Sequence, residues 1–148
     1  MSLIFKPLFE KESSTYTYLL ADSSTKEAII IDAVDETQQR DIGLIEELGL
    51  DLKYIIETHV HADHITSSCP LKQKFVNAQI VLGKTNPVAC ADVLIKDQET
   101  LEFGDYQMTA MTTPGHTDLY VVWMQWNCLY LLKSMSPCQR IKCVALKF

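Results

Sequence analysis

The chain contains only four histidines, and none of them stands apart from a recognisable motif. Three of them, His59, His61 and His64, fall within six consecutive positions that also hold Asp63. The fourth, His116, directly follows a Pro-Gly pair late in the chain. Imidazole and carboxylate side chains together are donors that suit zinc or iron. The grouping of every histidine in this way therefore predicts a metal site.

The backbone expected around the motif explains how these side chains can meet. A strand expected over 52–57 leads into His59, and residues two apart on extended backbone point the same way. His59 and His61 can therefore face one cavity. The rest of the motif lies where the chain turns into a helix expected over 65–75, so it approaches that cavity from another side. His116 follows a distant strand, and loops at strand ends are the usual place for such sites.

Elsewhere, short runs of β-branched, aromatic and aliphatic residues alternate with polar breaks. The continuously apolar run 28–31 favours a strand that is buried on both faces. Asp35 is expected to cap a helix that ends at Gly49, because apolar residues recur between them at helical spacing. The expected strands are 4–8, 16–21, 27–32, 52–57, 79–82, 100–103 and 107–111, with a helical turn over 87–93 and a hairpin at Gly104-Asp105. Strands that alternate with helices indicate an α/β or α+β domain.

Composition excludes several classes of protein. A chain of 148 residues with 47% hydrophobic residues is sufficient for one packed domain. The net charge of −6 argues against nucleic acid or an anionic membrane as the main partner. No run reaches the ~18 apolar residues of a membrane span. With five cysteines and no export pattern, we expect a cytoplasmic protein with reduced thiols, in which Cys69 serves packing.

The last 30 residues differ in composition from the rest. Residues 1–118 hold all 19 acidic residues and all five glycines, whereas 119–148 hold four basic residues and no acid. We therefore expect a domain over 1–118 and a divergent tail over 119–148, with a hairpin within 119–132. The abrupt change indicates a truncated gene or a tail read in another frame, and a natural divergent ending is the alternative.

The motif His59-x-His61-x-Asp63-His64 with a later Gly115-His116 resembles the metallo-β-lactamase superfamily. Further segments resemble its persulfide dioxygenase branch, whose next neighbours are the glyoxalase II hydroxyacylglutathione hydrolases. The resemblance covers 4–118 and implies the first half of an αββα sandwich, with the metal site at one edge of its two sheets. The segments are Leu8-Phe9-Glu10, Ser13-Ser14-Thr15-Tyr16-Thr17-Tyr18-Leu19-Leu20, Ile31-Asp32-Ala33-Val34, Glu57-Thr58-His59, Ala62-Asp63-His64-Ile65-Thr66 and Thr113-Pro114-Gly115-His116-Thr117-Asp118.

The resemblance also implies a set of metal ligands. In persulfide dioxygenases one iron(II) is held by residues that match His59 and His116, together with a later Asp, and His61, Asp63 and His64 orient the ligands. In the two-metal hydrolases, His59, His61 and His116 match the ligands of one metal, and Asp63 and His64 those of the other. Iron(II) is the expected cofactor, and zinc is the alternative. No other side chain is assigned a catalytic role.

One part of the family pattern is missing, because no Asp or Glu follows Asp118. The later Asp ligand therefore has no counterpart, and three functions stay open. The first is oxidation of glutathione persulfide by O2 to sulfite and glutathione. The second is hydrolysis of a glutathione thioester, and the third is a non-catalytic fragment that binds metal. Because half a sandwich leaves the apolar faces of 16–21 and 28–31 partly uncovered, we also expect a homodimer.

Overall fold

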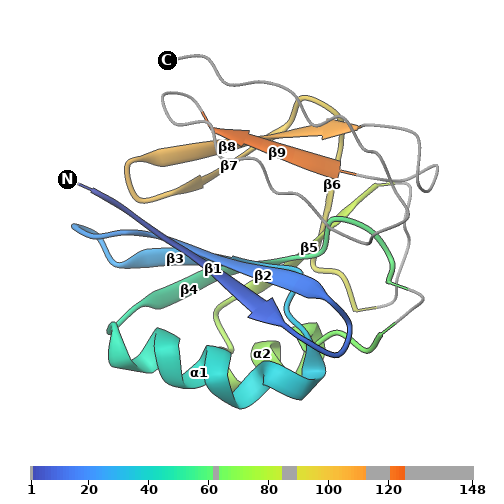
Figure 1. Cartoon of the computed structure of the whole chain (residues 1–148). Coiled ribbons are helices and arrows are strands. Elements are labelled where there is room, and N and C mark those ends of the chain that lie inside the picture. The colour runs from blue at the N-terminus through green and yellow to red at the C-terminus, as the bar shows by residue number, and fades with distance from the viewer. Residues whose placement is uncertain (1, 62–63, 85–89, 113–120, 126–148) are drawn as a thin grey trace.

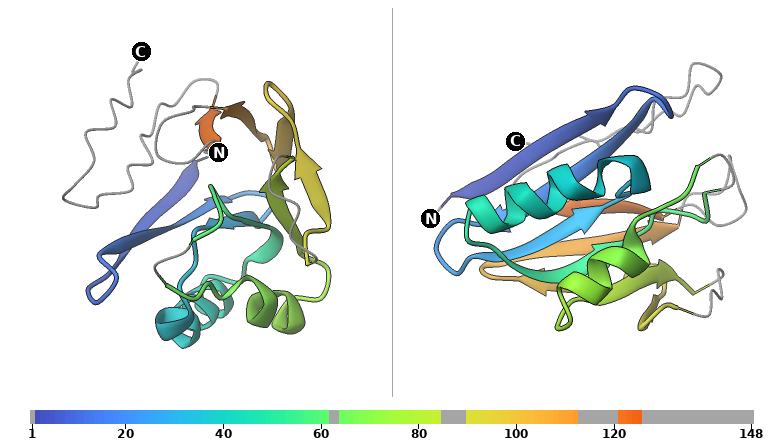
Figure 2. Two further views of the ribbon diagram at one scale, coloured as in Figure 1. Left: turned by 90° about the vertical axis from the view of Figure 1, so that its right-hand side faces the viewer. Right: turned by 90° about the horizontal axis from the view of Figure 1, so that it is seen from below.

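The computed structural model describes residues 2–61, 64–84, 90–112 and 121–125. These residues form a six-stranded sheet, a three-stranded sheet and two α-helices, stacked in three layers (Figure 1). Both helices cover one face of the larger sheet, and the smaller sheet lies over its other face (Figure 2). The expected mixed α/β class is confirmed. The three layers correspond to one helical layer and both sheets of the expected αββα sandwich.

The larger sheet changes from antiparallel to parallel pairing at its third strand. Strand β3 pairs with β2 in antiparallel fashion and with β4 in parallel fashion, and β5 and β6 continue the parallel part. The carboxyl ends of β3, β4 and β5 therefore meet at one edge of the sheet, where the histidine motif begins. The strands are β1 (Leu3–Glu10), β2 (Thr15–Asp22), β3 (Glu27–Ile31), β4 (Asp51–Ile56), β5 (Gln79–Gly83) and β6 (Val93–Ile95).

The two helices, α1 (Gln38–Glu47) and α2 (Ser68–Lys74), both begin later than the sequence pattern indicates. Asp35 does not cap α1, because 35–37 form a separate 3-10 turn without a capping side chain. The segment before α2 stays extended because Thr66 pairs with Val34, and the amide of Ser67 donates to the carbonyl of Ala33. These non-local hydrogen bonds outweigh the local preference for a helix from residue 65.

The smaller sheet consists of β7 (Thr100–Phe103), β8 (Tyr106–Thr112) and β9 (Val121–Gln125). The predicted hairpin at Gly104-Asp105 joins β7 to β8, and β9 pairs with β8 in antiparallel fashion. The expected helical turn over 87–93 is wrong at its end, where Val93 starts β6. Residues 85–89 and 126–148 lie outside the described residues, so the hairpin within 119–132 and the boundary at residue 118 stay predictions.

Two apolar clusters fill the spaces on either side of the larger sheet. In β3, Ile29 and Ile31 pack toward the smaller sheet and Ile30 packs toward the helices, and all three are fully buried. Phe103 and Met108 of the smaller sheet belong to the same cluster as Ile29 and Ile31. The expectation of uncovered apolar faces is therefore wrong, since the β7–β8 hairpin lies over them. The prediction that the run 28–31 forms a strand buried on both faces is confirmed.

The two sheets are joined at the end opposite the histidine motif. The amide of Gly104 donates to the Glu27 carboxylate at 2.6 Å, and the amide of Asp105 donates to the Asp22 carboxylate at 2.8 Å. Gly104 has a φ of +57°, and a Cβ there would collide with the Asp22 side chain. We call these four residues the inter-sheet clamp.

Candidate metal centre

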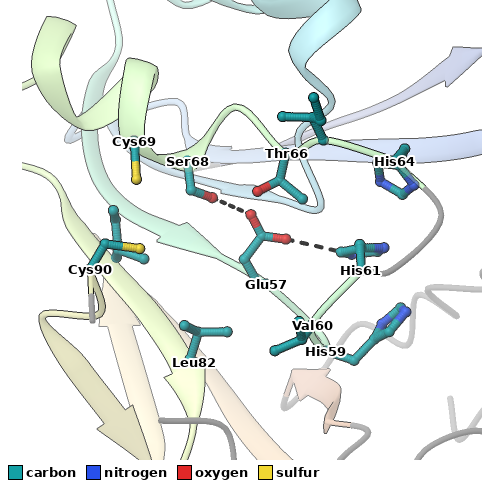
Figure 3. A pocket seen from close by; sticks show the side chains of 12 residues that line it. Glu57, His59, Val60, His61, His64, Thr66, Ser68, Cys69, Leu82 and Cys90 are labelled. Atoms are coloured by element: carbon teal, nitrogen blue, oxygen red, sulfur yellow. Dashed lines mark hydrogen bonds and ion pairs between the residues drawn. The ribbon is translucent and has the colours of Figure 1, made fainter. Parts of the chain in front are cut away.

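A pocket of about 260 Å³ lies at the edge where the parallel strands end (Figure 3). This edge is where α/β proteins usually bind ligands. One side of the pocket carries the described histidines, a second carries two cysteines, and apolar side chains line the space between them. The lining residues are Glu57, His59, Val60, His61, His64, Ile65, Thr66, Ser68, Cys69, Ile80, Leu82 and Cys90.

Three of the predicted site residues meet in this pocket. The ring centroids of His59 and His61 are 4.0 Å apart, and those of His61 and His64 are 4.4 Å apart. His59 is buried, and the side chain of His61 is only 4% exposed. The spacing argument correctly brings His59 and His61 to one cavity, and His64 joins them after the chain has turned.

The hydroxyl group of Thr58 determines the proton position on His59. Its Oγ1 lies 2.8 Å from Asp32 Oδ2 and 2.9 Å from His59 Nδ1. A hydroxyl has one proton, which it donates to the carboxylate, so it must accept from the ring. His59 therefore carries its proton on Nδ1, and Nε2 has the lone pair that a metal requires.

Two carboxylates hold the ring of His61 from behind. Its Nε2 lies 3.2 Å from Asp32 Oδ1 and 3.5 Å from Glu57 Oε2. The ionised carboxylate of Asp32 can only accept, so Nε2 is the protonated nitrogen and Nδ1 carries the lone pair. This is the carboxylate–histidine arrangement that fixes ring orientation and raises the basicity of metal ligands.

Glu57 and Asp32 have different charge preferences although they lie side by side. Burial and the negative charge of Asp32 raise the pKa of Glu57 to about 7. The hydroxyl of Ser68 donates to its Oε1. Burial also opposes ionisation of Asp32, but hydrogen bonds from His61 and Thr58 outweigh burial and lower its pKa. Asp32 is therefore the permanent negative charge behind the histidines.

Asp32 has an unusual backbone conformation, with a φ of +51°. Left-handed backbone is costly for most residues, and Asp tolerates it better than most. Its carbonyl accepts from Thr17, its amide donates to Ile56, and its carboxylate also accepts from the amide of Thr58. The strained turn thus directs one side chain at the histidine motif while β2, β3 and β4 hold it there.

Sequence reasoning did not identify Asp32 or Glu57 as site residues. Both stood only within segments of family resemblance, and the usable signal was an acidic residue at the end of each of two apolar strands. Donor atoms of Asp32, Glu57 and His61 all lie within 4.8 Å of one another, so this group could itself hold a metal. Because Thr58 already donates to both Asp32 oxygens, the geometry favours an orienting role.

The donor set fits a metal on chemical grounds. The three described imidazoles lie together, those of His59 and His61 have defined lone pairs, and buried carboxylates support them from behind. The other two predicted site residues, Asp63 and His116, lie outside the described residues, so the complete set of ligands stays a prediction.

The two cysteines of the pocket wall are both free and exposed. Cys69 stands in the first turn of α2, and Cys90 lies between β5 and β6. The expectation that Cys69 serves packing is wrong, because α2 begins only at Ser68 and presents its second residue at the surface. In the described part of the chain, no helix has the length and apolar character that crossing a membrane requires.

Comparison with known proteins agrees with this geometry. The chain is 44% identical over 115 residues to a bovine protein named persulfide dioxygenase ETHE1, mitochondrial, covering 78% of the chain and 45% of that protein. It is 33% identical over 113 residues to a probable hydroxyacylglutathione hydrolase of Schizosaccharomyces pombe, covering 75% of the chain and 43% of that protein. The chain therefore spans about half the length of the curated relatives it matches.

A solved structure and a family model agree as well. The crystal structure of ETHE1 from Myxococcus xanthus matches with a TM-score of 0.78 at 40% identity, covering 82% of this chain and 53% of that one. The family model for the metallo-beta-lactamase superfamily matches residues 11–125, which include all four histidines. Such proteins are metal-dependent, which implies a metal cofactor. The chain belongs to the metallo-β-lactamase superfamily.

Proposed function

We propose that this chain supplies the histidine side of a persulfide dioxygenase site, which oxidises glutathione persulfide with O2 to sulfite and glutathione. The observation that carries the proposal is the identity of 42–44% to three mammalian persulfide dioxygenases over 115 residues. A family match that includes every histidine supports it, as does a pocket that contains three of them.

The proposed ligands are His59, through Nε2, and His116, with His61, Asp63 and His64 beside them. Iron(II) bound there would supply the redox chemistry that O2 requires, and zinc is the alternative metal. Asp32 holds the protons on His59 Nδ1, through Thr58, and on His61 Nε2, which leaves the other ring nitrogens to bind an ion. This arrangement requires no rearrangement of protons when a cation arrives.

The remaining pocket residues suit a sulfur substrate. Val60, Ile65, Ile80 and Leu82 offer an apolar surface that excludes water and accommodates a polarizable sulfur atom. A glutathione persulfide, or a glutathione thioester in the hydrolase alternative, is therefore the proposed small-molecule partner.

The missing carboxylate limits the activity that we expect of this chain alone. No Asp or Glu follows Asp118, and the resemblance requires a carboxylate ligand beyond that point. We therefore expect the purified chain to hold less than one metal ion per molecule. The missing carboxylate favours an alternative, a fragment that binds metal without turnover. The histidines would have the same arrangement in both cases.

A thioester hydrolase is the second enzymatic candidate. It is favoured by hydroxyacylglutathione hydrolases among the relatives, at identities of 29% and 33%. These are lower than the identities to the persulfide dioxygenases, so we rank this function second.

The deciding experiment adds glutathione persulfide to the iron(II)-loaded chain and records O2 consumption with an oxygen electrode. The expected result is O2 uptake with formation of sulfite, which His59→Ala removes. Lactoylglutathione cleavage without O2 uptake would replace the proposal by the hydrolase. Retained metal with neither reaction would leave the non-catalytic function.

The cellular context stays a set of predictions. Free thiols at Cys69 and Cys90 fit the reducing cytoplasm that we propose, whereas the mammalian relatives are named as mitochondrial proteins. The net charge of −6 supports the proposal that neither nucleic acid nor an anionic membrane is a partner. A homodimer stays a prediction without support from the sheet faces, which are covered.

A further inference from the structure

Two thiols share one wall of the pocket, although they are 21 positions apart in the chain. Cys69 comes from the start of α2 and Cys90 from the turn before β6, and both line the pocket (Figure 3). Both are exposed, so small molecules can reach them from solvent. The metal site that we propose uses neither of them.

The two thiol side chains are neighbours on this wall of the pocket (Figure 3). The Cys90 thiol beside it, together with partial burial and the charge of Glu57, raises the pKa of Cys69. A raised pKa keeps the proton on Cys69, so we assign the first attack to Cys90 and the second to Cys69.

We propose that Cys69 and Cys90 form a dithiol site that takes sulfane sulfur from a low-molecular-weight persulfide and then closes to a disulfide. The choice of a persulfide as co-reactant rests on the proposed function. The dithiol itself rests on the neighbouring positions of the two thiols in the pocket wall.

The reaction proceeds in two displacements. The Cys90 sulfur attacks the outer sulfur of glutathione persulfide, the S–S bond breaks, and glutathione leaves with the electron pair and the Cys90 proton. Cys69 then attacks Cys90 Sγ, and the outer sulfur leaves with the Cys69 proton as hydrogen sulfide. Two thiols and one persulfide thus yield one disulfide, one glutathione and one hydrogen sulfide. The two thiols lose two electrons, and the sulfane sulfur gains them.

The test treats the reduced full-length chain, without oxygen and with a metal chelator, with an equimolar amount of glutathione persulfide. After alkylation and digestion with trypsin, mass spectrometry follows two peptides, 54–72 and 85–96, each of which contains a single cysteine. We expect these peptides to be joined by a disulfide at least about tenfold more often than either is joined to any other cysteine, because proximity favours the intramolecular step.

Single substitutions separate the two displacements. Cys69→Ser should trap an extra sulfur atom on Cys90, since the second step has lost its nucleophile. Cys128→Ser, the matched control, should leave the 54–72 to 85–96 disulfide unchanged. Unchanged alkylation of both peptides after treatment would overturn the proposal, and so would equal sulfur uptake by all five cysteines.

The outcomes also separate this proposal from the proposed function. The dithiol reaction needs neither metal nor O2, so His59→Ala should support it fully. Oxygen uptake by a chain whose thiols fail to react would refute only the dithiol. A disulfide formed by a chain that consumes no O2 with iron(II) would refute only the dioxygenase.

Discussion

Acidic residues lie at strand ends at both ends of the larger sheet, but their hydrogen-bond partners differ between the two ends. In the inter-sheet clamp, Asp22 and Glu27 accept hydrogen bonds from backbone amides of the β7–β8 turn. At the opposite edge, Asp32 and Glu57 face the ring of His61. The clamp therefore uses its carboxylates to join the sheets, whereas the pocket uses its carboxylates to orient imidazoles.

The pKa values show the consequence of this difference. In the clamp, hydrogen bonds from Ser24 and from the amide of Asp105 lower the pKa of Asp22, so the charge is stabilised by the fold. In the pocket, burial raises the pKa of Glu57 to about 7, so the fold opposes the charge. The comparison indicates that one end of the sandwich contributes stability and the other supports binding, and substitutions should separate these roles.

The largest effect is expected from His59→Ala at the pocket. Removing an imidazole that carries a lone pair into the proposed site should abolish bound iron or zinc, as measured by elemental analysis of the purified chain. The thermal midpoint of the metal-free chain should change little in comparison. Full metal occupancy in the variant would contradict the proposed ligand.

The second largest effect is expected from Gly104→Ala in the clamp. A Cβ there collides with Asp22 and occupies left-handed backbone, which should cost about 2–4 kcal/mol of unfolding free energy. Urea unfolding measures the loss, and the metal content of the folded fraction should stay the same.

Gly43→Ala is the matched control, because nothing lies within 4 Å of a Cβ at this position of α1. It should stabilise the chain by up to about 1 kcal/mol. Equal unfolding free energies for the two glycine variants would remove the argument for the clamp.

A subtler effect is expected from Asp32→Asn, since Asn tolerates the same left-handed backbone. The new amide group would donate to Thr58 Oγ1, which would then donate to His59 Nδ1 and move the ring proton to Nε2. Metal affinity should fall about 10–100-fold, as measured by competition with a chelator. The ring nitrogen shifts of His59 in NMR should report the changed tautomer.

Asp22→Asn is the corresponding substitution in the clamp. It should lower the unfolding free energy and leave the metal affinity unchanged. If both Asn variants weakened metal binding equally, the proposed division between the two ends would fail.

The smallest effect is expected from pH. Hydrogen bonds lower the pKa of Asp22, and hydrogen bonds led by that from Ser13 lower the pKa of Glu10 to about 2. A lowered pKa adds stability above the unfolded value of about 4, and this stability is lost as pH falls toward the folded value. Urea midpoints measured between about pH 5 and 3 should therefore decrease, and Asp22→Asn should flatten the decrease.

Asp41 should affect the pH dependence of stability in the opposite direction. Burial raises its pKa, so its protonation favours the folded state as pH falls. Asp41→Asn should therefore make the acid loss of stability steeper. A flatter acid profile for this variant would show that the sign is wrong.

The sequence was sufficient for the histidine cluster and for the strand that leads to it. His59 and His61 are two positions apart, so local geometry alone brings them together. The β3 strand was also predictable from local sequence, since an unbroken run of isoleucines indicates a strand with no exposed face. The hairpin at Gly104-Asp105 was also correct, because turn residues separate two alternating strands.

The supporting contacts could not be derived in this way. Asp32 and His61 are 29 positions apart, and their contact depends on the parallel pairing of β3 with β4 and on a backbone angle that no local pattern indicates. The late start of α2 has a similar origin, since Thr66 is held by Val34 across the fold. The features that the sequence did not predict are those that depend on pairing between distant segments of the chain.

The position of Asp32 has a consequence for how the pocket opens. Its hydrogen bonds reach Thr17, 15 positions away, and Thr58, 26 positions away, so its turn cannot detach without loosening three strands. The backbone beside His59 therefore cannot unfold locally while the rest of the domain stays folded. The Thr58 amide should therefore exchange its hydrogen with solvent only when the whole domain unfolds, which native-state hydrogen exchange would measure.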